Sequence, residues 1–250
     1  MQLIKGDCLV EMEKIASNSI DLIITDPPYG VGFSKGFDDS LEYVSSNIDK
    51  WFDEMYRVLK NGSHAYIFVP TKGIELFINS ITRKFELKNI VSGRTYTTGT
   101  YLKNNFYYNN QLILFLHKGK GKSFNEYNFI KTSESWYKDK RNKNPKRYTY
   151  SYPAFLPDLA FANTKGNGRD NRHPAEKNPE LIKFFVGISS KEGDIVLDPF
   201  MGGGSVGLAS MALKRDFIGV EIGQEYFDIA ESRLNEVGEG KPKACLQDRK

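Results

Sequence analysis

The chain has 250 residues, enough for one sizeable domain with a full hydrophobic core and an insertion. Its 40% hydrophobic and 26% charged residues are ordinary for a soluble globular protein. The sequence shows no signal peptide and no apolar run of membrane-span length, and Cys8 and Cys245 are too few for a disulfide framework and wrongly spaced for zinc. These features favour a cytoplasmic protein without a membrane partner and without a metal site.

The net charge of +4 hides an uneven distribution. Residues 93–172 carry 15 Lys and Arg against 5 Asp and Glu, together with 16 of the 33 aromatic residues, while the rest of the chain is mildly acidic. A basic block interleaved with aromatic residues is typical of a nucleic-acid-binding segment on an enzyme core. A solvated surface extension with its own small core would have the same composition and stays open as an alternative.

Short apolar runs alternate with amphipathic segments along most of the chain. The pattern predicts strands at 2–7, 21–25, 66–69, 87–91, 111–117, 194–198 and 217–221. Helices are expected after residue 8, through 47–59 with a stop at Asn61-Gly62, at 73–83, from Pro179 onward, at 205–213 and at 224–236. Strands that alternate with helices indicate an α/β fold with a mostly parallel, doubly wound sheet. Periodicity is weak across 119–172, where no elements are predicted.

The most informative short segment is Asp26-Pro27-Pro28-Tyr29, here called the DPPY turn, at the end of the run 21–25. Each proline fixes φ and lacks an N–H group, so the strand must end there, and Pro27 keeps Asp26 extended. Open α/β sheets bind ligands at the carboxyl ends of their strands. The Asp26 carboxylate and the Pro27 carbonyl can accept hydrogen bonds from an NH2 group, and Tyr29 can stack on a flat ring. A Pro-Pro turn with chance neighbours is the alternative.

Two segments are expected to flank the DPPY turn. The strand at 2–7 should run parallel to the strand at 21–25, which brings Asp7 to the same rim as Asp26. The glycine-rich segment 30–37 is either a loop that closes over substrate or a simple linker. The strands at 87–91 and 111–117 are interpreted as an antiparallel edge hairpin whose long loop overhangs the site. Aromatic residues of that loop are candidates for stacking on a base, namely Tyr101, Phe106, Tyr107 and Tyr108.

A second motif follows the strand at 194–198. Gly202-Gly203-Gly204-Ser205-Val206-Gly207, here called the glycine loop, matches G-x-G-x-x-G before a helix, and Glu221 ends the next strand. The glycines allow close approach of a ligand, and Glu221 can accept from both ribose hydroxyls. A dinucleotide site is therefore one alternative. Asp198 precedes the loop, however, and its carboxylate would stand where a pyrophosphate lies, whereas the cationic, phosphate-free S-adenosylmethionine tolerates it.

The DPPY turn and the segment Asp198-Pro199-Phe200-Met201-Gly202-Gly203-Gly204-Ser205 together resemble the S-adenosylmethionine-dependent amino-methyltransferases of DNA. The order of the motifs, with the catalytic turn first and the cofactor motif last, is similar to that of the β group of this family. The resemblance implies a circularly permuted, Rossmann-like methyltransferase fold with a seven-stranded sheet and a reversed edge hairpin. It implies a methyltransferase core at 1–118 and 173–250, with an inserted target-recognition region at 119–172 that binds DNA.

The resemblance also implies roles for individual residues. The DPPY turn would be catalytic. The residues that would contact S-adenosylmethionine, with S-adenosylhomocysteine as the product, are Asp198, Phe200, Gly202, Gly204, Ser205 and Glu221, and Asp7 and Cys8 would lie beside the adenine. His173-Pro174 and Lys177 resemble a further cofactor motif, H-P-x-x-K-P, but here Asn178 is inserted before Pro179, so the role of Lys177 stays open. The three histidines have no Ser or Cys partner at motif spacing and are interpreted as structural.

The expected activity is transfer of a methyl group to the N6 amino group of an adenine flipped out of duplex DNA. Asp at the first position of the turn favours adenine, and cytosine-N4 methylation is the nearest alternative. An RNA substrate, a glutamine side chain and a catalytically idle DNA-binding module are more distant ones. The setting implied is a bacterial or phage-encoded enzyme, and a cognate restriction endonuclease or a second copy of the chain as partner stays open.

Overall fold

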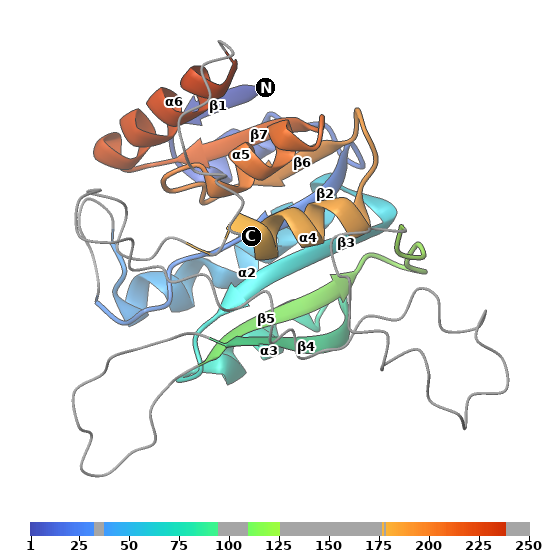
Figure 1. Cartoon of the computed structure of the whole chain (residues 1–250). Helices are drawn as coiled ribbons and strands as arrows, with labels where there is room; N and C mark the ends of the chain where they lie inside the picture. The colour runs from blue at the N-terminus through green and yellow to red at the C-terminus, as the bar shows by residue number, and fades with distance from the viewer. Residues whose placement is uncertain (33–37, 95–109, 126–176, 178, 239–250) are drawn as a thin grey trace, which may run out of the picture.

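The computed structural model describes residues 1–32, 38–94, 110–125, 177 and 179–238 (Figure 1). Within them one seven-stranded sheet has the order β1-β7-β6-β2-β3-β5-β4. Its strands are β1 (Gln2–Lys5), β2 (Ile20–Thr25), β3 (Leu59–Val69), β4 (Glu86–Arg94), β5 (Asn110–His117), β6 (Ile195–Asp198) and β7 (Asp216–Glu221). All neighbouring pairs are parallel except those that involve β5, which runs against both β3 and β4. The predicted doubly wound sheet with a reversed edge hairpin is therefore confirmed.

Helices cover both faces of this sheet (Figure 1). They are α1 (Cys8–Glu13), α2 (Leu41–Val58), α3 (Ile74–Ile81), α4 (Pro179–Ser189), α5 (Ser205–Ala212) and α6 (Gln224–Gly238). One apolar cluster joins the sheet to α4, α5 and α6, and the other joins it to α1, α2 and α3. Because both faces are covered, the central strand β2 is buried along its whole length, which explains the apolar residues 22–24 at its centre.

The strand order confirms the expected permutation. The strand before the glycine loop, β6, lies between β7 and β2, although these three strands come from opposite ends of the chain. The carboxyl ends of β6 and β2 are therefore neighbours, and each leads into one of the two motifs. Parallel α/β sheets bind ligands at such a position, where the chain order reverses between neighbouring strands.

Several predicted boundaries differ from the observed ones, among them both ends of α2. Helix α1, which was expected after residue 8, spans Cys8–Glu13. Helix α2 begins at Leu41, where the Ser40 hydroxyl accepts from the N–H of Tyr43, and it ends at Val58. The prediction that Asn61-Gly62 stops α2 was wrong, because Leu59 is already extended and opens β3. Local propensity did not reveal the long pairing of β3 with β2 and β5, which decides this boundary.

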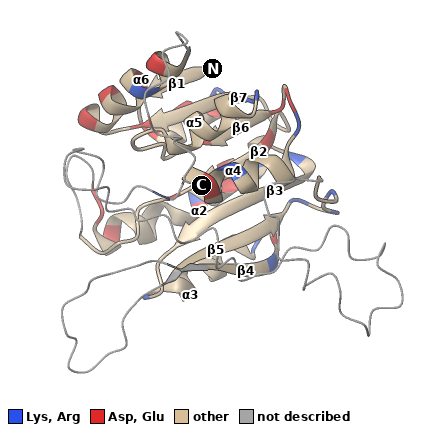
Figure 2. Cartoon of the chain, in the orientation of Figure 1, with Lys and Arg blue, Asp and Glu red and all other residues tan. Residues whose placement is uncertain are grey.

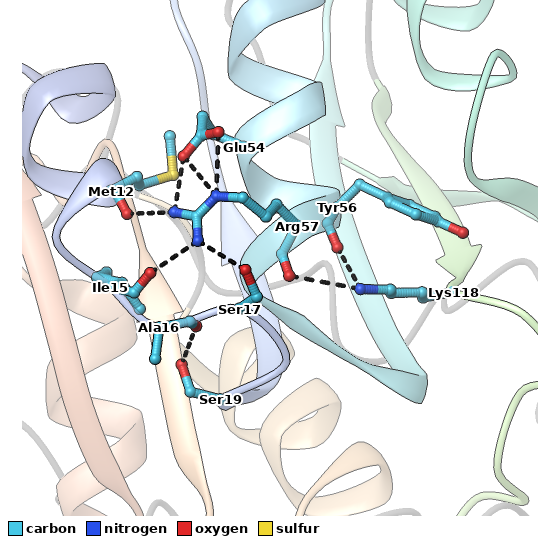
Figure 3. Close-up of polar contacts among 9 residues, drawn as sticks. All are labelled: Met12, Ile15, Ala16, Ser17, Ser19, Glu54, Tyr56, Arg57 and Lys118. Atoms are coloured by element: carbon cyan, nitrogen blue, oxygen red, sulfur yellow. Dashed lines mark hydrogen bonds and ion pairs between the residues drawn. The ribbon is translucent and has the colours of Figure 1, made fainter.

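Two cationic side chains, Arg57 and Lys118, form hydrogen bonds near the end of α2 (Figure 3). The Arg57 guanidinium forms an ion pair with Glu54 and donates to the carbonyls of Met12 and Ile15. The buried Lys118 ammonium donates to the carbonyls of Tyr56 and Leu59, at 2.6 and 2.7 Å, so it satisfies acceptors that the end of α2 leaves open. Lys118 is thus part of the core, although it begins the basic stretch of the sequence.

Residues 119–125 also pack on this end of the core. The Lys122 N–H donates to the Gly62 carbonyl, and the Asn125 N–H donates to Ile188 at the end of α4. His64 and His117 stack on each other beside this segment, with ring centroids 4.6 Å apart. Both rings are enclosed by the fold, as expected for structural histidines, whereas His173 lies outside the described residues. The remainder of the predicted target-recognition region, 126–172, and the hairpin loop 95–109 also lie outside them.

Charge is unevenly spread over the described surface. Acidic side chains follow helix α6, from Glu225 through Asp228 to Glu231 (Figure 2). Among the described helices none is long and apolar enough to cross a membrane.

Candidate active site

One cavity of about 490 Å³ lies at the carboxyl ends of β1, β7, β6 and β2. Both motifs line it, and so do Asp7 and Cys8 at the start of α1. This confirms the prediction that Asp7 lies on the same rim of the sheet as Asp26. Four strands contribute to the cavity because they are parallel and end at the same edge of the sheet.

The DPPY turn contributes its carboxylate and its aromatic ring to this cavity. The Tyr29 hydroxyl donates to Asp26 Oδ1 in a short hydrogen bond, so these two side chains act as one unit. Burial raises the pKa of Tyr29 well above its ordinary value, and the neighbouring Asp26 carboxylate raises it further. The hydroxyl therefore keeps its proton and remains a donor. The Tyr29 ring packs edge-on against Phe77, which fixes its orientation.

Asp39 fixes the backbone of the DPPY turn from outside the motif. Its Oδ1 accepts from the N–H groups of Tyr29 and Gly30, at 2.8 and 2.7 Å, and the side chain is buried. Its carbonyl accepts from the N–H of Gly32. The sequence interpretation did not single out Asp39, because no local pattern links it to a turn ten residues earlier. An aspartate just before a helix N-cap was the available signal.

The glycine loop and Glu221 form the opposite wall. Glu221 Oε2 accepts from the Gly202 N–H at 2.9 Å, and Oε1 accepts from the Gly223 N–H at 2.6 Å. A carboxylate has about four acceptor sites, so Glu221 keeps capacity for a ligand hydroxyl. Gly202 has φ of +49°, and a Cβ there would meet no protein atom within 4 Å, so its backbone faces open space in the cavity.

Asp198 lies between the two motifs. Its Oδ1 accepts from the Thr25 hydroxyl at 2.6 Å and from the Phe200 N–H at 3.1 Å, which ties β6 to β2. The pKa of Asp198 is raised to about 7, first by burial and then by the carboxylates of Asp26 and Glu221, against the lowering effect of these two hydrogen bonds. Thr25 was not among the predicted site residues, because its partner lies 173 positions away in the sequence.

The cavity suits a cationic ligand with a ribose and a flat base. Its described lining has six acidic residues against Lys177 and Arg233, a charge balance that favours a sulfonium and disfavours a pyrophosphate. Glu221 has free acceptor capacity for ribose hydroxyls, and Gly202 leaves room for close approach. These features fit S-adenosylmethionine and argue against the dinucleotide alternative.

The predicted cofactor residues do not all lie in this cavity. Those that line it are Asp7, Cys8, Lys177, Asp198, Phe200, Gly202, Ser205 and Glu221. Gly204 is outside the lining: it adopts φ of +80°, caps α5, and a Cβ there would crowd Ala230 of α6. Its conformation and close packing explain the glycine without a ligand contact. His173 and Pro174 fall outside the described residues.

Lys177 lies at the DPPY turn. Its ammonium is 2.7 Å from Asp26 Oδ2 and 3.3 Å from Gln111 Oε1. The inserted Asn178 does not prevent α4 from beginning at Pro179, as predicted. Arg233, which donates to the Gly203 carbonyl, is a further lining residue that the motifs did not indicate.

Comparisons with known proteins agree with this geometry. A family model described as DNA methylase matches residues 20–232. The chain is 31% identical to DNA adenine methyltransferase YhdJ of Escherichia coli (strain K12), over 93% of this chain and 82% of that protein. It is 30% identical to type II methyltransferase M.HpaI of Haemophilus parainfluenzae, over 94% of this chain and 74% of that protein.

Solved structures share the fold. The M1.HpyAVI–SAM complex matches with a TM-score of 0.63 at 24% identity, covering 93% of this chain and 99% of that one. The cytosine-N4-specific PvuII DNA methyltransferase matches with a TM-score of 0.67 at 19% identity, covering 93% and 85%. With the family model spanning most of the sequence, the chain belongs to the family of S-adenosylmethionine-dependent DNA amino-methyltransferases.

Proposed function

We propose that this protein methylates the N6 amino group of an adenine that is flipped out of duplex DNA, with S-adenosylmethionine as the donor. The observation that carries the proposal is the Asp26 carboxylate, which lies in the cavity with its partner Tyr29. Base flipping is required because an exocyclic amino group cannot be reached inside a stacked duplex.

The chemistry asks the protein to make a poor nucleophile react. The lone pair of the adenine amino group is delocalised into the ring. Hydrogen bonds from that NH2 group to Asp26 and to the Pro27 carbonyl localise the lone pair as charge develops on nitrogen. The Tyr29 hydroxyl holds Asp26 in place, and the Tyr29 ring supplies a surface for the base. S-adenosylmethionine, when bound, supplies an electrophilic methyl carbon on a sulfonium.

The residues opposite Asp26 are suited to bind and orient that donor. Glu221 would accept from the ribose hydroxyls, the backbone at Gly202 would lie against the ligand, and Asp198 would face its positive charge. Phe200 and Ser205 complete this wall, and Asp7 and Cys8 would lie beside the adenine of the donor. An in-line arrangement of sulfonium and amino group between the two walls supplies much of the rate.

Adenine is preferred over cytosine as the target for two reasons. Aspartate at the first position of the turn is commoner for adenine in the family that the sequence resembles. YhdJ, which is 31% identical, is named a DNA adenine methyltransferase. Cytosine-N4 methylation is the second candidate, because both targets are exocyclic amines and the cytosine-N4-specific PvuII enzyme has the same fold.

DNA contacts are assigned to the basic region. We propose that 1–118 and 173–250 form the catalytic core and that 119–172 recognises the target, with its Lys and Arg side chains on phosphates. Residues 122 and 125, at the start of this region, donate backbone hydrogen bonds to the core. A cognate restriction endonuclease, a second copy of the chain and a cytoplasmic location remain predictions.

The test is a methyl-transfer assay with labelled S-adenosylmethionine and mixed-sequence duplex DNA, followed by nucleoside digestion and mass detection. N6-methyladenine is the expected product. N4-methylcytosine would keep the site chemistry and overturn the choice of base. Donor binding without a methylated base would contradict the proposal and direct the search to RNA or protein substrates.

A further inference from the structure

We propose that the Lys177 ammonium occupies the position of the target amino group when no base is bound, and that the entering base displaces it. Lys177 would then be a positioning residue for the catalytic turn, and the target base would bind only by replacing its ion pair. The inference rests on the proposed function, because it assigns the base pocket to Asp26 and Tyr29.

The contacts of Lys177 are those expected of the target base. Its Nζ is 2.7 Å from Asp26 Oδ2, the oxygen that the Tyr29 hydroxyl does not use. The same atom is 5.7 Å from the centroid of the Tyr29 ring and 5.1 Å from that of Phe68. A nitrogen that donates to Asp26 beside the Tyr29 ring is where the mechanism requires the exocyclic amine.

The Lys177–Asp26 ion pair is partly buried. The Lys177 and Asp26 side chains are 16% and 28% exposed, so solvent screens their attraction less than it screens a pair on the open surface. Gln111, from β5, accepts a further hydrogen bond from Lys177 at 3.3 Å. Lys177 therefore connects the segment before α4 to Asp26 at the end of β2 and to Gln111 of β5.

Lys177 cannot keep this position during methyl transfer. The amino nitrogen gains positive charge as it accepts the methyl group, and an ammonium bound to the same carboxylate would repel that charge. It would also compete with the amino group for the Asp26 oxygen that the amino group needs as a hydrogen-bond acceptor. The ion pair therefore belongs to the step before base entry, in which Lys177 keeps the Asp26 carboxylate paired until a base with its own N–H donor arrives.

The experiment measures how much the target amino group contributes to DNA affinity with and without Lys177. After the recognition sequence is mapped with the assay above, two duplexes are compared in the presence of S-adenosylhomocysteine. Both place the target nucleotide opposite an abasic site, and the target is either adenine or purine, which lacks the 6-amino group. The ratio of their dissociation constants is measured for the wild type and for Lys177→Met, Lys177→Arg and Lys183→Met.

In the wild type the amino group only replaces Lys177, so it adds little affinity. In Lys177→Met, which keeps the aliphatic stem, we expect the preference for adenine over purine to rise about fivefold, the size of one partly buried ion pair. Lys177→Arg keeps the charge and should retain the wild-type ratio. Lys183→Met removes another lysine near the start of α4, paired with Glu180, and should also leave the ratio unchanged.

Three results would overturn the inference. An unchanged ratio in Lys177→Met would show that Lys177 does not compete with the base. A weaker S-adenosylmethionine affinity with an unchanged ratio would assign Lys177 to the cofactor instead. A raised ratio in Lys177→Arg as well would show that the charge is not the cause. If the wild type makes no methylated base at all, the proposed function fails, and that result is visible before any Lys177 variant is tested.

Discussion

At the scale of single residues, Asp39 shows how a catalytic turn is held from outside its own motif. The two N–H groups that follow Pro28 lie beyond the end of β2, and the buried Asp39 carboxylate accepts from both. Buried donors that lose such an acceptor are costly. Asp39 therefore sets the direction in which Asp26 and Tyr29 enter the cavity.

Replacing Asp39 should loosen the turn in a graded way. Asp39→Ala leaves two N–H groups without an acceptor and is expected to lower the free energy of unfolding by ~1–3 kcal/mol, with a lower methyl-transfer rate. Asp39→Asn keeps an oxygen at Oδ1, so its effect should be smaller. Urea unfolding and single-turnover kinetics measure the two effects. Wild-type stability and rate in Asp39→Ala would refute this role.

Asp26 is expected to act in the chemical step and not in cofactor binding. Asp26→Ala should reduce kcat by about 100-fold or more, because it removes the acceptor that localises the amine lone pair. The dissociation constant of S-adenosylmethionine, measured by calorimetry, should stay close to the wild-type value. The matched control is Asp53→Ala on α2, which breaks the surface ion pair of Asp53 with Lys84. Retained activity in Asp26→Ala would contradict the proposed role of Asp26 as the acceptor for the target amino group.

At the scale of elements, the end of α2 depends on a lysine from another strand. Lys118 follows β5 directly, and its ammonium donates to the Tyr56 carbonyl (Figure 3). It also donates to the Leu59 carbonyl and to the Asn18 side chain. Its stem and the Tyr56 ring pack together, with Nζ 4.6 Å from the ring centroid. This one side chain thereby joins α2, β5 and the turn before β2.

Lys118→Met should lower stability without affecting the chemistry. It leaves three acceptors unpaired in a buried position, for which we expect a loss of ~2 kcal/mol in the free energy of unfolding. The cavity lies at the other edge of the sheet, so kcat and cofactor affinity should not change. Lys120→Met, at an exposed position two residues on, is the control. A fall in kcat for the folded Lys118 variant would contradict the structural role.

The stacked histidines give the sheet a pH-sensitive contact. His64 Nε2 donates to the Lys122 carbonyl at 2.9 Å, and Nδ1 is 2.8 Å from the Ser189 hydroxyl, which makes the neutral ring the one that fits. The pKa of His64 is lowered to about 4, mainly by burial and also by the neighbouring His117. Burial also lowers the pKa of His117, whose ring nitrogens have no hydrogen-bond partner among the described residues.

Stability should therefore fall in acid. Between pH 6.5 and about 4 the unfolded chain binds a proton on His64 that the folded protein excludes, so this stability is present above pH 6.5 and lost on acidification. The expected loss is on the order of 3 kcal/mol. Urea unfolding at pH 7 and pH 4.5 measures this loss in the wild type and in His117→Phe, in which the change in the free energy of unfolding between the two pH values should be smaller. The comparison cancels the contribution of Asp198, which has the opposite sign. An equal change in the two proteins would contradict the role of the stacked histidines.

At the scale of the whole molecule, the cavity joins the two ends of the chain. Its walls come from β1 and β2 near the N-terminus and from β6 and β7 near the C-terminus. Each strand brings an acidic residue to the same edge, so Asp7, Asp26, Asp198 and Glu221 gather around one space. Burial, with a smaller contribution from the nearby carboxylates of Asp26 and Glu221, favours the protonated form of Asp198 until a cation enters.

Binding of S-adenosylmethionine should strengthen with pH for this reason. Below about pH 7 the ligand-free protein holds a proton on Asp198, and the cationic ligand must expel it; above that pH the carboxylate is already ionised. Affinity should therefore rise from pH 6 to pH 8, by at most about tenfold per pH unit. Asp198→Asn should bind weakly and without this slope, whereas Asp228→Asn on α6 should behave like the wild type. Calorimetry at both pH values decides, and a pH-independent wild type would exclude Asp198 as the titrating group.

The sequence by itself determined the features that arise from neighbouring residues. Two prolines must end β2, the glycines must open a turn after β6, and apolar runs mark buried strands, because backbone sterics and burial act locally. The resemblance of the two motifs and of their order to a known family implied the permuted sheet, and the strands at 87–91 and 111–117 were interpreted as the edge hairpin. Helix ends were less certain, as at Asn61-Gly62, because strand pairing overrides local propensity there.

Only the tertiary structure decided which distant groups meet. The Thr25–Asp198 hydrogen bond, the Asp39 bonds to the DPPY turn, the Lys177–Asp26 ion pair and the buried Lys118 have no local signature. Gly204 shows the converse, since a glycine that the motif suggests for a ligand serves the packing of α5 on α6. The physical reason is common to all of them. Parallel strands from both ends of the chain finish at one edge, and polar side chains there pair with whatever the fold brings within reach.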